Sequence, residues 1–510
     1  MNRLFTRCLG PTFILAVVTT SANAQDDDGG NDLLDKVPPV LKAMGAEVGR
    51  QEGGRIRAIY LTDRNVRDAD LAILRRFPEV ETLWLGGNPI TDRGMGVVSP
   101  LAKLTDLDLS GTRVAGLIGL DSPRGLKSLK LNGSAADDSL AGFVRRCPAL
   151  SVLFLENTRI GDVFLRDISG HPALGGIWLG GTLVSDAGMA SLATLKGVDY
   201  LELDETAVGD AGMAHLAGMV RMRSLRLANT KLGDAGMAHL AGMNWLYDLD
   251  LSDTKVGDAG MAHLAGKPAM QTLDLSGTKV GDAGLASLAG MPELMELGLI
   301  GTDVGDAGMA HLARCPKLER LHLAGTKVGD AGMAALARCP ALAYVDLDDT
   351  RVGDAGLANI ARSRTITGLD LGKTRVTDAG LIHLADLSEL GYLNLSGTAV
   401  GDAGLANLTK VQQLESLDIS DTRITGVGLA HVPLMSHLYR LDLSGTAVDD
   451  AGLARLFDDE GRPLGFEVLN IEKTRISPGG VQRFLSKLPQ PDRINLHAKI
   501  GKKGVMTTIW

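Results

Sequence analysis

The sequence contains little cysteine, proline or aromatic side chain, and each shortage excludes a class of protein. Four cysteines among 510 residues are too few to cross-link a chain of this length, so a disulfide scaffold is excluded. Eighteen prolines, without glycine at every third position, exclude collagen. Aromatic residues make up 4% of the chain, yet the hydrophobic share of 45% is too high for a disordered, low-complexity protein.

Long apolar runs are also lacking, and the one candidate stretch covers residues 9–19. Arg3 and Arg7 start this segment, and Ala22-Asn23-Ala24 follows it as a cleavage site of the small-x-small type. The stretch is shorter than the ~20 residues that span a bilayer, which favours a signal peptide over a membrane anchor. We therefore predict that residues 1–24 are a signal peptide cut after Ala24, and that the protein is secreted or periplasmic, with no membrane span.

The mature chain is expected to be acidic. Loss of Arg3 and Arg7 changes the formal net charge to −9 − 2 = −11. Proteins that bind nucleic acid use basic patches to neutralise phosphates, so an acidic extracytoplasmic protein is not expected to bind nucleic acid. Residues 25–32 form an acidic, glycine-rich linker, and apolar residues at helical spacing predict a helical cap over residues 33–55.

Glycine, in contrast, is abundant, with 64 residues, and its excess points to regularly placed turns. Pairs of the Leu-x-Leu type recur every 24 residues from Ile59 onward, with one step of 22 after Leu107 and one of 28 after Leu441. A last degenerate pair is Ile494 and Leu496. The series gives nineteen candidate strands.

One repeat, from Met270, reads MQTLDLSGTKVGDAGLASLAGMPE. Leu273 and Leu275 alternate with polar residues, as in a strand with one buried face. The Thr278 hydroxyl can bond the backbone of the following turn, and Asp282 is expected to cap the short helix that begins there. Because 24 residues cannot bury a core alone, neighbouring repeats must stack. The repeat therefore predicts a solenoid with a parallel concave sheet and short convex helices.

The pattern LxxLxLxxTxVxDAGLxxLA resembles the leucine-rich repeat family over about residues 56–499. Arg-Cys-Pro-x-Leu at Cys147, Cys315 and Cys339 is similar to the short bacterial repeats akin to the cysteine-containing subtype of F-box proteins. The resemblance implies an α/β fold, a curved right-handed horseshoe of about 19 coils, followed by a C-terminal tail at residues 500–510. It also implies a binding scaffold whose partners contact the concave face.

Two repeated side chains could carry chemistry. Cys315 and Cys339 lie in adjacent coils, so a disulfide is conceivable, but the odd number of mature cysteines favours buried free thiols. A histidine column on the convex helices could take a metal ion or respond to pH, although coil repetition alone explains it. The column consists of His215, His239, His263, His311 and His383.

The concave position between the paired leucines changes from coil to coil. Phe154 and Trp178 occupy it on neighbouring strands, and Tyr200 stands just before the next strand's leucine. Exposed aromatic residues that cluster in this way predict a contact patch for a partner. The alternative is that they pack against one another or, for Tyr60 and Trp84, under the N-terminal cap.

Later coils place mainly acidic residues on the same face. The further candidate contact residues are Glu202, Arg226, Asp250, Asp274, His322 and Asp346. This acidic surface could select a basic partner or hold Ca²⁺ weakly between carboxylates on adjacent strands. It could also serve only to keep the strands soluble.

A catalytic signature is lacking as well. The sequence contains no His-Glu-x-x-His, Cys-x-x-Cys, Gly-x-Ser-x-Gly or phosphate-binding loop. We therefore predict a non-catalytic extracytoplasmic scaffold without a cofactor, which binds a protein through its concave face. Two alternatives stay open: an F-box-like substrate receptor of a ubiquitin ligase, and a structural protein of the envelope or cell surface.

Overall fold

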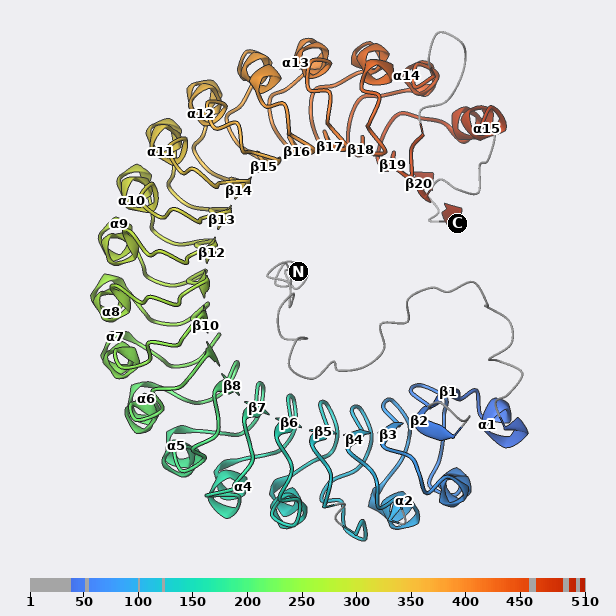
Figure 1. Ribbon diagram of the computed structural model, residues 1–510. Helices are drawn as coiled ribbons and strands as arrows, with labels where there is room; N and C mark the ends of the chain where they lie inside the picture. Colours follow the sequence, from blue (N-terminus) through green and yellow to red (C-terminus); the bar gives the residue numbers. More distant parts are fainter. Residues whose placement is uncertain are drawn as a thin grey trace.

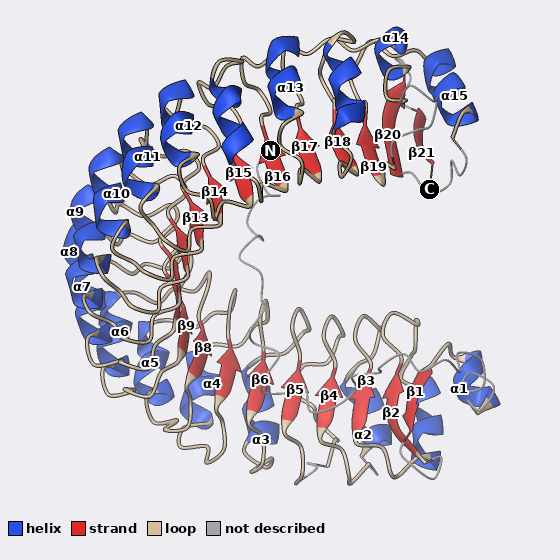
Figure 2. Cartoon of the chain, turned by 45° about the horizontal axis from the view of Figure 1, so that its top comes forward, coloured by secondary structure: helices blue, strands red, loops and turns tan. Residues whose placement is uncertain are grey.

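The computed structural model describes residues 38–50, 55–99, 101–121, 124–457, 465–488, 495–500 and 505–509. The signal peptide and the acidic linker expected at residues 1–32 lie outside this part of the chain. The described chain winds into an open horseshoe in which each coil follows the previous one in sequence order (Figure 1). Strands line the inner side and short helices the outer side, so the expected fold class is confirmed (Figure 2).

In the described part of the chain, the inner layer is a single sheet of 21 strands, in which each strand pairs with the next in sequence. Strands β2 to β20 are parallel and correspond to the nineteen expected candidates. The strands are β1 (Glu47–Arg50), β2 (Ile56–Tyr60), β3 (Thr82–Trp84), β4 (Asp106–Asp108), β5 (Ser128–Lys130), β6 (Val152–Phe154), β7 (Gly176–Trp178), β8 (Tyr200–Glu202), β9 (Ser224–Arg226), β10 (Asp248–Asp250), β11 (Thr272–Asp274), β12 (Glu296–Gly298), β13 (Arg320–His322), β14 (Tyr344–Asp346), β15 (Gly368–Asp370), β16 (Tyr392–Asn394), β17 (Ser416–Asp418), β18 (Arg440–Asp442), β19 (Val468–Asn470), β20 (Asn495–Ile500) and β21 (Val505–Ile509).

The outer layer consists of short helices, several of which are 3₁₀ helices (η) in part or throughout. A helix is wider than the ~4.8 Å spacing of strands, so stacking one helix per strand curves the sheet inward. The helices are α1 (Pro39–Ala43), η3 (Asp70–Arg76), α2 (Asp92–Val98), η4 (Asp138–Leu140), α3 (Ala141–Val144), α4 (Asp162–Asp167), α5 (Asp186–Leu192), α6 (Asp210–Leu216), α7 (Asp234–Met237), η5 (Ala238–Leu240), α8 (Asp258–Met261), η6 (Ala262–Leu264), α9 (Asp282–Leu285), η7 (Ala286–Leu288), α10 (Asp306–Leu312), α11 (Asp330–Leu336), α12 (Asp354–Ile360), η8 (Gly380–Asp386), α13 (Asp402–Leu408), η9 (Gly428–Leu434), α14 (Asp450–Leu453) and α15 (Pro478–Ser486).

The core lies between the two layers and repeats from coil to coil. In the repeat from Met270, Leu273, Leu275, Val280 and Leu285 are completely buried. The parallel register stacks each leucine on its equivalent one coil away, so the core is a continuous column rather than a central cluster. The ladder threonine is buried too, and its hydroxyl donates to the carbonyl three residues earlier, as Thr278 does to Leu275 at 2.6 Å.

The two ends of the sheet lie in the segments where a helical cap (residues 33–55) and a tail (residues 500–510) are expected. Among the described residues of the first segment, the five-residue helix α1 is followed by strand β1, which pairs antiparallel with β2. At the other end β21 pairs antiparallel with β20. Each end of the parallel sheet is therefore extended by one antiparallel strand, which satisfies backbone groups that an open edge would leave unpaired.

The recurring aspartate at the start of each helix acts on the neighbouring coil, which corrects the expectation that Asp282 caps its own helix. The N-cap of α9 is Gly281, which makes no side-chain hydrogen bond. The Asp282 carboxylate instead accepts from the backbone N–H groups of Gly305 (2.7 Å) and Gly308 (3.0 Å) at the start of α10. The same bond to the residue 23 positions on is made by Asp186, Asp210, Asp234, Asp258, Asp306, Asp330 and Asp378. We call this series the aspartate ladder.

The opposite ends of some helices are also capped from a neighbouring coil. Cys315 donates its thiol to the carbonyl of Leu288 at 3.2 Å, at the end of η7. Lys267 occupies the same register, is buried, and donates to the carbonyl of Leu240 at 2.6 Å and to two more carbonyls nearby. The three described cysteines, Cys147 among them, are buried and form no disulfide with one another, as the sequence favoured.

The turn after each strand requires a left-handed backbone, which places one of the abundant glycines. Gly277 precedes the ladder threonine with φ of +68°. Asp253 and Glu205 adopt φ of 54° and 57° in the same register of other coils, although side chains disfavour this conformation.

Among the helices that the structure describes, none has the length and apolar character to cross a membrane.

Candidate functional site

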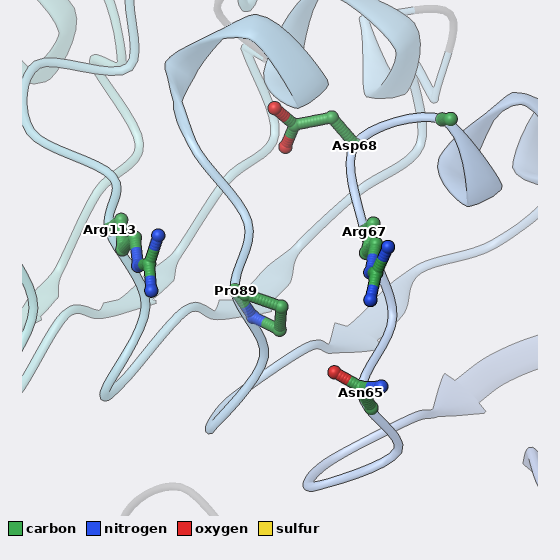
Figure 3. Close-up of a pocket in the computed structure, with 6 residues that line it drawn as sticks. Asn65, Arg67, Asp68, Pro89 and Arg113 are labelled. Carbon is green, nitrogen blue, oxygen red and sulfur yellow. The ribbon is translucent and has the colours of Figure 1, made fainter.

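The candidate contact residues from the sequence all lie on the concave sheet, and a separate hollow lies at the flank of the horseshoe. That hollow has a volume of about 470 Å³ and is lined by Asn65, Arg67, Asp68, Pro89 and Arg113, among others. Arg67 and Arg113 lie on either side of Pro89 (Figure 3). None of the nine candidate residues lines this hollow.

The N-terminal third of the concave face carries a row of aromatic rings joined by one lysine. Phe154 on β6 and Trp178 on β7 stack with their ring centroids 4.4 Å apart and their planes at 24°. Lys130 on β5 lies 5.5 Å from the Phe154 ring and 5.4 Å from the ring of Trp84. Trp84 in turn meets Tyr60 edge to face at 4.8 Å. We call these five residues the aromatic row.

A glycine makes room for the largest ring of the aromatic row. A Cβ atom on Gly176, two residues before Trp178 on β7, would lie 2.6 Å from the Trp178 ring. The indole therefore lies along its own strand, and its six-membered ring covers the glycine. Tyr200 stands beside Gly176 on β8 and is hydrogen-bonded to Tyr247, so it does not extend the stack as the sequence suggested. In the described part of the chain, no ring contact joins Tyr200 to Trp178.

Next to the aromatic row, two carboxyl groups meet over another glycine. Glu202 on β8 lies over Gly180, whose Cβ atom would be 2.6 Å from the Glu202 carboxylate, and it shares a hydrogen bond with Glu156. Burial, followed by the nearby charge of Asp204 and Glu156, raises the pKa of Glu202 to about 8. At neutral pH the Glu202 carboxyl therefore holds a proton, which makes the hydrogen bond between two acids possible.

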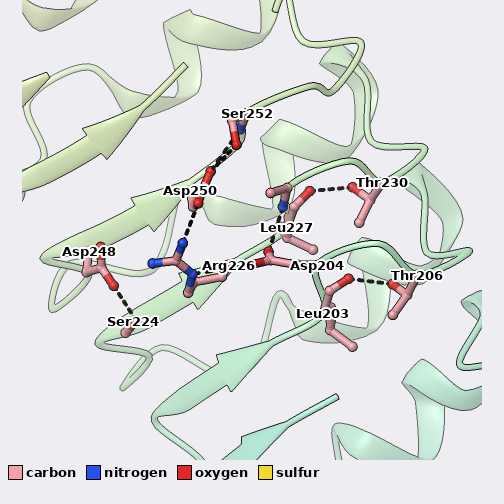
Figure 4. A network of polar contacts seen from close by, with 11 residues as sticks. Leu203, Asp204, Thr206, Ser224, Arg226, Leu227, Thr230, Asp248, Asp250 and Ser252 are labelled. Atoms are coloured by element: carbon pink, nitrogen blue, oxygen red, sulfur yellow. Dashed lines mark hydrogen bonds and ion pairs between the residues drawn. The ribbon is translucent and has the colours of Figure 1, made fainter. Parts of the chain in front are cut away.

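One arginine holds the adjacent acidic residues together (Figure 4). Arg226 on β9 donates to Asp250 at 2.7 Å and to Asp204 at 3.4 Å. Asp204 also accepts from the backbone N–H of Ala228 at 2.7 Å, and Asp248 accepts from the Ser224 hydroxyl at 2.6 Å. Burial raises the pKa of Asp204 to about 6, against the attraction of Arg226. The patch therefore contains more acids than its single guanidinium neutralises.

Three concave residues that the sequence places in the exposed register are buried, which is a correction. Asp250, Asp274 and His322 are 5%, 8% and 6% exposed. Asp274 leans over Gly298, which offers no side chain, while its carboxylate accepts from the N–H of Ser276. The sheet is curved inward, so side chains on its inner face crowd together and cover one another.

The structure also brings together a second cluster that sequence reasoning missed. Tyr344 and Tyr392 lean toward each other over Gly368, with centroids 6.3 Å apart, and His322 lies 5.6 Å from Tyr344. Arg320 lies 6.0 Å from the Tyr344 ring. Each tyrosine stands directly before the first core residue of its strand, Val345 or Leu393, rather than between the two core residues. Two tyrosines at a 48-residue spacing with glycine between them are the signal that was available.

The remaining candidates are dispersed. Asp346 on β14 is half-buried, and burial raises its pKa to about 6. The convex histidines are exposed or half-buried, as expected from their helix position. Within the described ranges, no group of three or more histidine, cysteine, aspartate or glutamate side chains is placed to hold a metal ion, so the expected weak Ca²⁺ site gains no support from geometry.

Comparisons with known proteins identify the repeat. A family model described as leucine-rich repeat matches residues 242–265, 268–289 and 314–337. No protein of curated function matches the chain. The resemblance to the cysteine-containing subtype stays a prediction.

Several solved structures share the fold. The leucine-rich-repeat ectodomain of the Arabidopsis thaliana membrane receptor kinase GASSHO1/SCHENGEN3, in complex with Casparian strip integrity factor 2, superposes with a TM-score of 0.53 at 16% identity, covering 93% of this chain and 62% of that chain. This chain therefore spans less than two thirds of that ectodomain. A Leptospira interrogans leucine-rich-repeat protein gives 0.54 at 15% identity, covering 84% and 98%. The Arabidopsis receptor kinase HAESA, in complex with the peptide hormone IDA and co-receptor SERK1, gives 0.52 at 16%, covering 88% and 80%.

Proposed function

We propose that this chain, a leucine-rich-repeat solenoid by fold and by repeat, is a non-catalytic, extracytoplasmic scaffold that binds a protein through its concave face. The observation that carries the proposal is the stack of Phe154 and Trp178 on the open inner sheet. Both rings are half-buried, so part of their apolar surface is left for a partner. Large aromatic side chains in such positions are the usual anchors of protein interfaces.

The charge beside the stack indicates what the partner carries. Arg226 interacts electrostatically with four carboxyl groups, those of Asp250, Asp204, Asp248 and Glu202. A lysine or arginine of a partner, placed beside Trp178, would offset the excess acid and lie against an aromatic ring. We therefore expect a partner segment with an apolar anchor for the aromatic row and a basic residue for Glu202 and Asp204.

The solved relatives fit this reading. Two of them were solved with a peptide hormone or an integrity factor bound. The extracytoplasmic location is proposed because residues 1–24 have the pattern of a signal peptide. Sequencing the N-terminus of the protein purified from its native source tests this, and Gln25 is the expected first residue. A full-length N-terminus would instead leave open an F-box-like role inside the cell.

The central experiment is an affinity capture from the extracytoplasmic fraction. It compares the wild-type protein with a Phe154→Ala/Trp178→Ala double variant. The matched control is Trp245→Ala, which removes a tryptophan that is 65% exposed in the loop leading into β10, away from the concave face. We expect the double variant to lose a captured protein that wild type and control both retain. Identical captured proteins for all three would contradict the proposal.

A quantitative version follows once a captured protein is purified. The affinity of wild type for a basic partner is expected to rise between pH 7 and pH 9, because Glu202 loses its proton near pH 8 and adds a negative charge to the patch. The Glu202→Gln variant keeps the shape of the side chain but cannot gain that charge, so its affinity should not rise. Equal pH dependence of both proteins would remove Glu202 from the contact.

A further inference from the structure

A second surface lies on the flank where strands run into helices. In the register directly after the ladder threonine, six of seven consecutive coils carry a basic residue: Lys231, Lys255, Lys279, Lys327, Arg351 and Arg375. All six side chains are exposed. The single break in this run is Asp303, between Lys279 and Lys327. We call the six residues the basic edge; it is distinct from the concave face and from the flank hollow.

The backbone fixes the positions of these residues. Each one donates its N–H to the carbonyl of the residue 23 positions earlier, as Lys231 does to Val208 at 2.9 Å and Arg375 to Val352 at 2.8 Å. Parallel bridges join Lys231 to Gly209 and Arg375 to Gly353. One basic residue per coil is thus held at close to the strand spacing, about 4.8 Å, so the seven coils from Lys231 to Arg375 span roughly 29 Å.

The charges on the basic edge are mostly left without partners. Among the described residues, only Lys327 of the six forms an ion pair, with Asp303 at 2.6 Å. Asp253 and Asp349 lie two residues before Lys255 and Arg351 and offset part of the charge. The aspartate ladder runs close by, but its carboxylates accept from helix N–H groups. The protein has a formal net charge of −9, so a row of six cationic side chains is opposite in sign to the charge of the whole chain.

We propose that the basic edge binds a linear anionic polysaccharide, one whose carboxylate or sulfate groups lie along the row. The row runs from coil to coil in sequence order, so a flexible single chain can contact all six basic residues. Single-stranded nucleic acid is favoured by aromatic platforms on which bases stack, and the seven positions carry only lysine, arginine and aspartate.

The test uses the full chain and end-labelled polygalacturonate oligomers, with uncharged dextran as the neutral probe. The edge variant combines Lys255→Gln, Lys279→Gln, Lys327→Gln and Arg351→Gln. The control variant removes the same charge from exposed positions at helix ends, through Arg314→Gln, Arg338→Gln, Arg362→Gln and Lys410→Gln. Binding is measured by fluorescence anisotropy at several salt concentrations, and thermal melting verifies that both variants remain folded.

We expect the edge variant to bind about tenfold more weakly and with a shallower dependence on salt, because fewer counterions are released. The control is expected to change affinity less than about twofold, and dextran should not bind. Affinity should also rise with oligomer length until the chain covers the roughly 29 Å span. Equal losses in both variants, or no binding by wild type at physiological salt, would overturn the proposal. Tighter binding of single-stranded DNA of equal length and charge would overturn the choice of polysaccharide.

Discussion

The outer and inner sides of the horseshoe differ in how closely their residues repeat from coil to coil. On the outer side, each aspartate of the ladder accepts from the N–H of a helix glycine in the next coil. This pair of residues recurs with almost no change from Asp186 to Asp306. On the inner side the residue between the leucines is more variable, for example Phe154, Glu202 and His322, although aspartate recurs there in the later coils. The difference is physical: an outer side chain must bond the next coil, whereas an inner side chain only has to fit beside its neighbours.

This contrast separates scaffold from specificity. Where each coil caps its neighbour, a change in one coil breaks a bond in the next, so every coil needs the same residues. Where side chains meet on the concave sheet, glycines such as Gly176 and Gly180 are placed singly, each under one large neighbour. Substitutions on the outer side should therefore affect stability at every pH, and substitutions on the inner side should affect binding or the way stability depends on pH.

The largest expected effect on stability comes from replacing the helix glycine whose N–H donates to the aspartate of the previous coil. In the Gly308→Ala variant, the new Cβ atom would lie 2.7 Å from the Asp282 carboxylate and 2.9 Å from a methyl carbon of Leu285. Asp282 could move only by losing its two hydrogen bonds, so we expect a loss of about 3 kcal/mol in the free energy of unfolding. Urea denaturation followed by circular dichroism measures it.

The neighbouring glycine provides the control. A Cβ atom on Gly305 would meet nothing closer than 3.5 Å, so Gly305→Ala is expected to cost less than about 1 kcal/mol. Equal losses for the two alanine variants would show that helix geometry, rather than the approach of Asp282, requires glycine on the outer side.

The second effect removes the aspartate itself. Asp282→Ala leaves the N–H groups of Gly305 and Gly308 without their carboxylate, and we expect a loss of about 2 kcal/mol. Asp303→Ala removes an exposed aspartate whose partner is Lys327, and should cost close to nothing. Because Asp282 and Gly308 act on one contact, the Asp282→Ala/Gly308→Ala variant should lose less than the two single losses added together. Strict additivity would contradict the ladder.

The sequence allowed most of the scaffold to be predicted. Alternation of leucines placed all nineteen parallel strands, because a buried strand face leaves a local, period-2 pattern. The hydrogen bonds of Asp282 are not predicted correctly, because an aspartate at the start of a helix suggests a cap of that same helix. The N–H group that donates to Asp282 is 23 residues away, on Gly305, and becomes visible only when coils are superposed. The antiparallel end strands β1 and β21 break the repeat, so its period could not predict them.

The concave face was less predictable, because its geometry depends on side chains in different coils. The stack of Phe154 on Trp178 followed from adjacent strands in one register. The burial of Asp274 did not, since it depends on curvature and on Gly298 one coil later. The cluster of Tyr344 and Tyr392 required two registers to be considered together, across a glycine.

A third effect tests the inner side through pH. The pKa of Glu202 is raised from 4.5 to about 8, so the folded chain holds a proton that the unfolded chain has lost. Stability should therefore fall as pH rises from about 4.5 to 8. Glu202→Gln removes this dependence, and we expect it to be more stable than wild type at pH 8 by on the order of 2 kcal/mol, with little difference at pH 4. Melting temperatures measured across this range test it.

The control for this pH effect is Glu319→Gln, which neutralises an exposed glutamate. Its melting temperature should follow that of wild type at every pH. If Glu202→Gln also follows wild type throughout, the two carboxyl groups of Glu156 and Glu202 do not share a proton, and the inner side has no strained acid.

The smallest effect concerns the turn that links the two sides. Glu205 holds a left-handed backbone with φ of 57°, in the register where Gly277 has φ of +68°. Glu205→Gly relieves this strain but loosens the unfolded chain, so we expect a net gain of about 0.5 kcal/mol. The reverse change, Gly277→Glu, should cost more than Glu205→Gly gains, because a Cβ atom at Gly277 would also meet the Asp253 carboxylate. If Glu205→Gly instead destabilises the protein, contacts of the Glu205 side chain outweigh its backbone strain, and this register belongs with the variable inner side rather than with the scaffold.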